Sequence, residues 1–237
     1  MSGVSVVDII YNSDCMTGMR KLPDDCIDLI VTDPPYIMES RGCGFIRNRN
    51  VTALSEIQDA GLADGFDTAV FSEFMRLMER PNIYIWCAAR QIPVCIDFFV
   101  NENGCKFDII IWQKTNPMPL FSGKWLTDKE YCLYFRKGGY CNPVTFDDAR
   151  TVFTQPVNAK DKNIYNHPTI KPLNIIETLI KNSSREGDVV LDPFMGSGTT
   201  ALAAAKNNRR YIGFEINETY CKTATERVND YKRRFLT

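Results

Sequence analysis

The 237-residue sequence predicts an α/β protein built on one doubly wound, mostly parallel sheet. Two observations carry this prediction. β-rich runs alternate with helical patterns along the chain, and most of the runs are continuously apolar, as in strands covered on both faces. The runs lie at residues 6–11, 27–32, 82–87, 107–112, 131–135, 188–191 and 211–214, so we expect a seven-stranded sheet. Function should then lie at the carboxyl ends of the strands.

Helical patterns fall between these runs. One apolar stripe lies within residues 70–78, with Asp67 and Thr68 suited to cap it. A second lies within residues 173–180, with Pro172 suited to its first turn. A short helix is expected at residues 201–205, and a last one begins at Asn217, with basic residues 232–234 near its end.

Composition bounds the class of protein. A hydrophobic fraction of 44% with 24% charged residues is typical of a soluble enzyme, and no apolar run approaches the roughly 20 residues of a membrane span. The N-terminus lacks a basic region followed by an apolar one, so we expect a mature cytoplasmic chain. Nine cysteines without a C-x-x-C pair indicate neither a disulfide framework nor a metal site.

Two long polar stretches, residues 37–66 and 138–166, lack periodicity and are typical of functional or mobile loops within a single domain, residues 1–237. The net charge is only −1, so a nucleic-acid partner would require a local concentration of positive charge. The candidates for it are Arg41, Arg47, Arg49, Arg136, Lys137, Lys160 and Lys162.

A glycine turn follows the strand at residues 188–191. Gly196-Ser197-Gly198-Thr199-Thr200-Ala201 satisfies the pattern G-x-G-x-x-G/A, in which glycines permit a tight turn and the close approach of a ligand. Glu215 ends the next strand, where a carboxylate can bind ribose hydroxyls. No Lys-Ser/Thr follows the glycines, which excludes a phosphate-binding P-loop, while a pyrophosphate dinucleotide stays open on the local pattern.

A second strand end carries Asp33-Pro34-Pro35-Tyr36. The amino group of adenine or cytosine is a poor nucleophile, because its lone pair is delocalised into the ring. A carboxylate and a carbonyl can accept its two N–H bonds and leave the lone pair facing an electrophile; Asp33 and Pro34 supply these acceptors. Tyr36 offers a face on which an extruded base can stack.

Three segments, in this order, resemble the permuted beta class of amino-directed DNA methyltransferases, and the similarity spans nearly the whole chain. The segments are Thr32-Asp33-Pro34-Pro35-Tyr36, His167-Pro168-Thr169-Ile170-Lys171-Pro172, and Leu191-Asp192-Pro193-Phe194-Met195-Gly196-Ser197-Gly198-Thr199-Thr200. The resemblance implies a circularly permuted, Rossmann-like fold, S-adenosylmethionine as cofactor, and methylation of adenine N6 or cytosine N4 in DNA.

Site residues follow from the same resemblance. Asp33, Pro34, Pro35 and Tyr36 would hold the target base. The cofactor would contact Asp14, Cys15, Asp33, His167, Thr169, Lys171, Asp192, Pro193, Phe194, Gly196, Ser197, Gly198, Thr199 and Glu215. His167, Thr169 and Lys171 would close over the methionyl tail, with His167 binding or merely packing. Neither a covalent intermediate nor a metal is expected.

Adenine N6 is favoured over cytosine N4, because the cytosine enzymes more often carry Ser in place of Asp33. The segment at 138–166, where the family usually reads sequence, is short here. Base readout would then be limited, shared with the 37–66 loop, or completed in a homodimer. The alternatives are a catalytically silent DNA-binding relative, a nicotinamide oxidoreductase, and a methyltransferase for RNA or protein amides.

Overall fold

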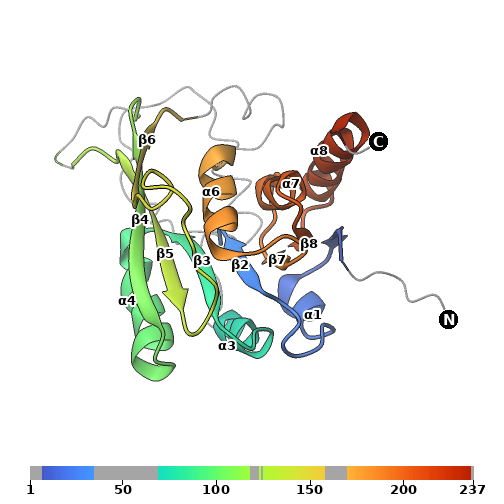
Figure 1. Ribbon diagram of the computed structural model, residues 1–237, viewed down its shortest axis with the longest axis horizontal. Coiled ribbons are helices and arrows are strands. Elements are labelled where there is room, and N and C mark those ends of the chain that lie inside the picture. Colours follow the sequence, from blue (N-terminus) through green and yellow to red (C-terminus); the bar gives the residue numbers. More distant parts are fainter. Residues whose placement is uncertain (1–6, 35–68, 118–122, 124, 158–169, 236–237) are drawn as a thin grey trace.

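The computed structural model describes residues 7–34, 69–117, 123, 125–157 and 170–235. The elements in chain order are β1 Ile9–Asn12, α1 Cys15–Met19, β2 Leu29–Thr32, α3 Ala69–Arg76, β3 Asn82–Cys87, η2 Ala89–Gln91, α4 Ile92–Ile96, η3 Asp97–Glu102, β4 Lys106–Lys114, β5 Lys129–Arg136, β6 Val152–Gln155, α6 Leu173–Ser183, β7 Val189–Asp192, α7 Thr199–Lys206, β8 Arg210–Glu215 and α8 Glu218–Phe235 (Figure 1).

The strands form one sheet in the order β1-β8-β7-β2-β3-β5-β4-β6. Strand β5 is antiparallel to both of its neighbours, and the other described pairs are parallel. The predicted α/β class with a mostly parallel sheet is confirmed. Strand β2 lies beside β7 although about 160 residues separate them along the chain, so the two strand ends identified from sequence become neighbours.

The predicted number of strands is wrong, because the described residues form eight. The additional strand, β6, lies inside the stretch 138–166 that was expected to be a loop, and it pairs with β4 at the sheet edge. Its four residues alternate between exposed and half-buried positions, so they lack the continuous apolar run that marks the inner strands.

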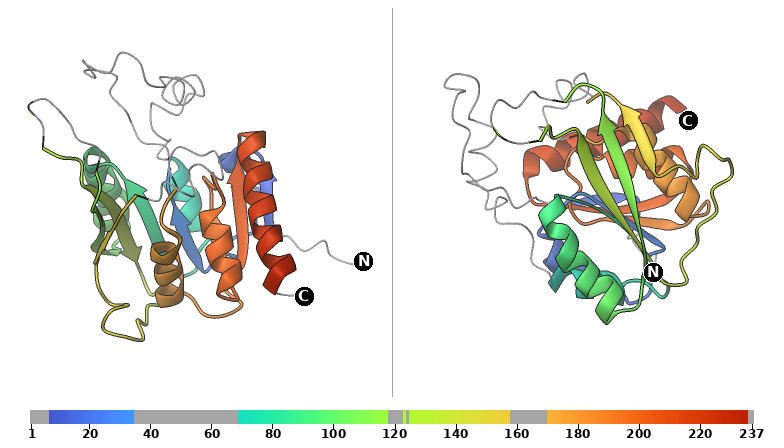
Figure 2. Two further views of the ribbon diagram at one scale, coloured as in Figure 1. Left: turned by 90° about the horizontal axis from the view of Figure 1, so that it is seen from above. Right: turned by 90° about the vertical axis from the view of Figure 1, so that its left-hand side faces the viewer.

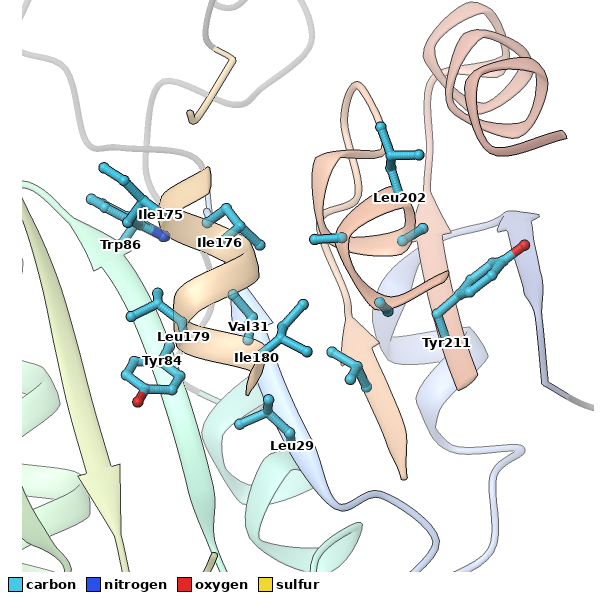
Figure 3. Close-up of a cluster of buried hydrophobic side chains, with 14 of the residues drawn as sticks. Leu29, Val31, Tyr84, Trp86, Ile175, Ile176, Leu179, Ile180, Leu202 and Tyr211 are labelled. Carbon is cyan, nitrogen blue, oxygen red and sulfur yellow. The ribbon is translucent and has the colours of Figure 1, made fainter. Parts of the chain in front are cut away.

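Helices α6, α7 and α8 cover one face of the sheet (Figure 2). Alternate residues of each strand point to this face. Figure 3 shows Ile176 and Ile180 of α6 above Leu29 and Val31 of β2, with Tyr84 and Trp86 of β3 beside them. Pro172 immediately precedes α6 as its N-cap rather than lying in its first turn.

The opposite face takes the intervening strand residues, such as Ile30 of β2 and Ile83 and Ile85 of β3. Helices α1 and α3, together with the continuous segment α4–η3, cover this face; α1 and α4–η3 were not predicted as helices. Six of the eight described cysteines are buried, as expected of small apolar side chains. The described part of the chain contains no helix long and apolar enough to cross a membrane.

The direction of β5 decides which loops share an edge of the sheet. Because β5 runs against its neighbours, its last residue, Arg136, lies at the amino edge, and so does the start of the following segment. Lys137 there donates to the carbonyl of Asn103. The candidate basic pair Arg136 and Lys137 therefore lies at the edge opposite the carboxyl ends of the parallel strands, away from the expected site.

Candidate active site

A cavity of about 290 Å³ opens at the carboxyl ends of the parallel strands. It joins the two strand ends that the sequence singled out: Asp33 after β2 and Asp192 at the end of β7. The predicted residues that line it are Asp14, Cys15, Asp33, Pro34, Lys171, Asp192, Pro193, Phe194, Gly196, Ser197, Thr199 and Glu215. Pro35, Tyr36, His167 and Thr169 lie outside the described residues.

Asp33 is held by a cation. The Lys171 Nζ lies 2.5 Å from the Asp33 Oδ2, and the Lys171 side chain is only 7% exposed. It also lies 5.3 Å from the centre of the Trp86 ring. Lys171, which was predicted to close over the methionyl tail, is thus placed against the Asp33 carboxylate.

A second carboxylate shares this cation. Glu130 Oε2 lies 3.0 Å from Lys171 Nζ, and Glu130 Oε1 lies 2.8 Å from Lys114 Nζ. Burial alone would raise the pKa of Glu130, but the neighbouring Lys171 and Lys114 lower it to about 2. Glu130 is therefore ionised at neutral pH, and the two carboxylates and two ammonium groups alternate across the site.

Asp192 connects the two strand ends. Its Oδ1 accepts hydrogen bonds from the Thr32 hydroxyl, at 2.9 Å, and from the Phe194 backbone N–H, at 3.1 Å. Burial raises the pKa of Asp192 to about 7; the charge of Asp33 adds to this, and hydrogen bonds from Thr200, Phe194 and Thr32 oppose it. Asp192 therefore titrates near neutral pH.

The glycine turn is closed by Glu215. One carboxylate oxygen accepts from the Gly196 N–H and the other from the Asn217 N–H, both at 2.8 Å. Burial raises the pKa of this carboxyl, and these backbone donors counteract part of the rise. Because each carboxylate oxygen has two lone pairs, Glu215 can hold the turn and still accept from ribose hydroxyls.

Gly198 has a structural role and does not line the cavity. It is the N-cap of α7 with φ +79°, and a Cβ there would lie 2.8 Å from the Cβ of Ala224 on α8. Arg227, also on α8 and buried, donates to the Ser197 carbonyl and the Thr199 hydroxyl. Helix α8 thus fixes the turn from behind.

Asp14 begins α1, where its Oδ1 accepts from the Thr17 N–H at 2.8 Å. The helix therefore starts at the mouth of the cavity, with Asp14 and Cys15 in the wall. Burial raises the pKa of the Cys15 thiol to about 11, and Asp14 adds to the rise. Cys15 is consequently a neutral, apolar part of the cavity lining and not a nucleophile.

Several residues of the site were not predicted. Trp86 is the penultimate residue of β3, and Tyr220 lies in the first turn of α8; both line the cavity. Glu130, which pairs with Lys171, was not among the predicted site residues. The position of Trp86 at the carboxyl end of a predicted strand was a usable signal, whereas the contact of Glu130 with Lys171 depends on the antiparallel β5 and carries no local signal.

One cavity thus contains Asp33 together with the glycine turn and Glu215. A family model described as DNA methylase, N6_N4_Mtase, matches residues 27–226. The chain therefore belongs to this family of DNA methylases. The expected activity class, an enzyme that methylates DNA, is confirmed.

Relatives cover almost the whole chain. The type II methyltransferase M2.LlaDCHI of Lactococcus lactis subsp. cremoris is 29% identical over 93% of this chain and 89% of its own length. M2.MboI of Moraxella bovis is 28% identical over 93% and 87%. The solved structure of an M1.HpyAVI–SAM complex is 29% identical, with a TM-score of 0.65, over 92% of this chain and 98% of its own.

The PvuII DNA methyltransferase, described as cytosine-N4-specific, has a TM-score of 0.65 at 16% identity and covers 96% of this chain and 92% of its own. This likeness shows the common fold.

Proposed function

We propose that the protein transfers a methyl group from S-adenosylmethionine to the N6 amino group of adenine in DNA. One observation carries the proposal: Asp33, at the end of β2, opens into the same cavity as the glycine turn and Glu215. An acceptor for an amino group and a nucleotide site thus meet at adjacent strand ends.

The residues present fit S-adenosylmethionine. Four acidic side chains line the cavity, from Asp14, Asp33, Asp192 and Glu215, and negative charge there suits a ligand with a cationic sulfonium. Glu215 would bind the ribose hydroxyls, Asp14 would lie near the adenine, and Phe194 and Gly196 would line the methionine portion. When bound, the cofactor supplies a methyl group activated on sulfur.

The chain itself orients the amino group. Asp33 accepts one N–H and the Pro34 carbonyl accepts the other, so that the nitrogen lone pair faces the methyl group. Tyr36 is assigned the stacking of the flipped base. The nitrogen becomes strongly acidic once alkylated, so the proton is lost without a strong base, and His167 is assigned a binding or packing role.

Asp33 favours adenine as the target. Cytosine-N4 enzymes more often carry Ser at this position, and that activity is the second candidate. The structure brings the carboxylate to the cavity with its charge compensated by Lys171, so it can act as an acceptor.

DNA would be read at the carboxyl edge of the sheet. The segment 37–66 follows the catalytic strand, and residues 156–166 follow β6, which runs parallel to β4 toward this edge. Residues 138–151 begin at the opposite edge, so we assign base readout to the later part of the predicted 138–166 segment.

We propose that residues 1–237 form one circularly permuted domain. Homodimerisation and a cytoplasmic location stay predictions.

Expression in a host that lacks DNA methylation, followed by modification-sensitive sequencing of its genome, tests the proposal. We expect N6-methyladenine in one short sequence context. A genome without new methylation, or with N4-methylcytosine alone, would exclude the adenine assignment.

A further inference from the structure

Asp33 stands at one end of a row of four alternating charges that no sequence motif contains as a unit. The row runs Asp33, Lys171, Glu130, Lys114, with successive nitrogen–oxygen distances of 2.5, 3.0 and 2.8 Å. Its members come from four separate segments: the end of β2, the approach to α6, the start of β5 and the end of β4. The folded sheet assembles the row.

The two inner members are the most constrained. The side chains of Lys171 and Glu130 are 7% and 21% exposed. Withdrawing an ammonium group from water is costly unless carboxylates compensate it. Lys171 meets this need with two carboxylates, one on each side, and Trp86 faces it with its ring.

The row also fixes charge near the reacting atoms. Two carboxylates and two ammonium groups sum to zero, so the site presents the Asp33 carboxylate without an excess of negative charge. Removal of Lys171 would leave Asp33 and Glu130 without the cation between them, beside the further carboxyl of Asp192. The nearby ammonium favours the ionised form of Asp33, which is the form that accepts an N–H.

We infer that Lys171, anchored by Glu130, is a positioning group that keeps the Asp33 carboxylate ionised and correctly oriented for methyl transfer. Glu130 does not line the cavity and acts through its ion pair with Lys171. The inference rests on the proposed role of Asp33. It differs from a role for Lys171 in holding the methionyl tail, which would be expressed in cofactor affinity.

Rates at saturating cofactor, measured across pH, distinguish these roles. For Lys171→Gln we expect kcat to fall at least tenfold and the acid limb of the kcat profile to move up by about one to three pH units, because an opposite charge no longer favours the carboxylate. Lys171→Arg, which keeps the charge, should retain the position of the acid limb. Affinity for S-adenosylhomocysteine, measured by calorimetry, should change little in either variant.

Glu130→Gln tests the anchor. It should lower kcat in the wild-type background but have little further effect in the Lys171→Gln background, because a group that acts through Lys171 has nothing left to position. Glu177→Gln is the matched control: Glu177 of α6 pairs with Lys206 of α7 at 2.5 Å and does not line the cavity, so its loss should leave kcat unchanged. Thermal unfolding and the binding of S-adenosylhomocysteine verify that each variant is folded.

The inference is overturned if Lys171→Gln leaves the acid limb in place, or if it weakens cofactor binding while kcat at saturation is preserved. It is also overturned if the effects of Glu130→Gln and Lys171→Gln multiply. Wild-type protein that forms no methylated DNA would instead contradict the proposed function, so the two failures are distinguishable.

Discussion

The Thr32 hydroxyl donates a hydrogen bond to Asp192 Oδ1 at 2.9 Å, and this contact joins the carboxyl end of β2 to the carboxyl end of β7. Thr32 immediately precedes Asp33, and Asp192 precedes the Phe194–Gly198 turn. The register of two parallel strands therefore sets the position of Asp33, the proposed amino-group acceptor, relative to the glycine turn.

Asp192→Asn should change how stability depends on pH. The pKa of Asp192 is raised from 3.8 to about 7 by folding, so the folded state binds more protons than the unfolded state between these values. The free energy of unfolding therefore falls as pH rises from about 4 to about 7, by roughly 4 kcal/mol at most from this group. The variant should lose this contribution.

Urea unfolding at pH 5 and pH 8 checks this prediction. Relative to wild type, Asp192→Asn should be more stable at pH 8 than at pH 5. A difference between the two proteins that is the same at both pH values would contradict a buried Asp192 whose pKa is raised by folding.

Glu215→Gln should weaken cofactor binding. The amide would place an NH₂ group against one of the two backbone donors that the carboxylate now accepts, and it would weaken the bonds to ribose. We expect the dissociation constant of S-adenosylmethionine to rise roughly 10- to 100-fold, as measured by calorimetry. Glu218→Gln, at an exposed position three residues further along the chain, is the control and should bind S-adenosylmethionine normally. Equal affinities for wild type and Glu215→Gln would remove Glu215 from the site.

Gly198→Ala should destabilise the fold. The position has φ +79°, and the new Cβ would lie 2.8 Å from the Cβ of Ala224 and 2.9 Å from its Cα. Backbone strain and overpacking together should cost about 2 to 4 kcal/mol. Gly187→Ala, at φ +86° with open space around the new Cβ, isolates the backbone strain and should cost about 1 to 2 kcal/mol. Denaturant titrations that give equal losses would show that the α7–α8 contact is not tight.

Asp33→Ala should abolish methyl transfer while cofactor binding largely survives. Removing the acceptor leaves the amino group without orientation, and we expect kcat to fall by at least about 10²- to 10³-fold. Tritium transfer from labelled cofactor to DNA measures the rate, and calorimetry measures the affinity. Retained activity in this variant would remove Asp33 from the mechanism.

The sequence was most informative where structure is local. The buried strands β2, β3, β7 and β8 are short, largely apolar runs, and the acidic residues at or directly after the ends of β2, β7 and β8 can be recognised without coordinates. Asp33, Asp192 and Glu215 were predicted at strand ends, and the structure brings them to one cavity.

Features that depend on distant pairing were not predictable. Strand β6 is recognised only by its hydrogen bonds to β4. The position of Arg136 at the far edge follows from the antiparallel β5 rather than from the basic residues themselves. The contact of Glu130 with Lys171 joins residues about 40 positions apart, and no spacing rule indicates it. The glycine pattern suggested ligand contact for Gly198, whereas tertiary packing against Ala224 occupies it.

Analysis of nucleosides by mass spectrometry shows directly whether the protein methylates adenine in DNA and whether this activity requires Asp33. Purified protein is incubated with S-adenosylmethionine and unmethylated duplex DNA, with Asp33→Ala in parallel, and the DNA is digested. We expect N6-methyladenine from the wild-type protein and none from the variant. Unmodified DNA or N4-methylcytosine from the wild type, or equal N6-methyladenine from both proteins, would contradict it.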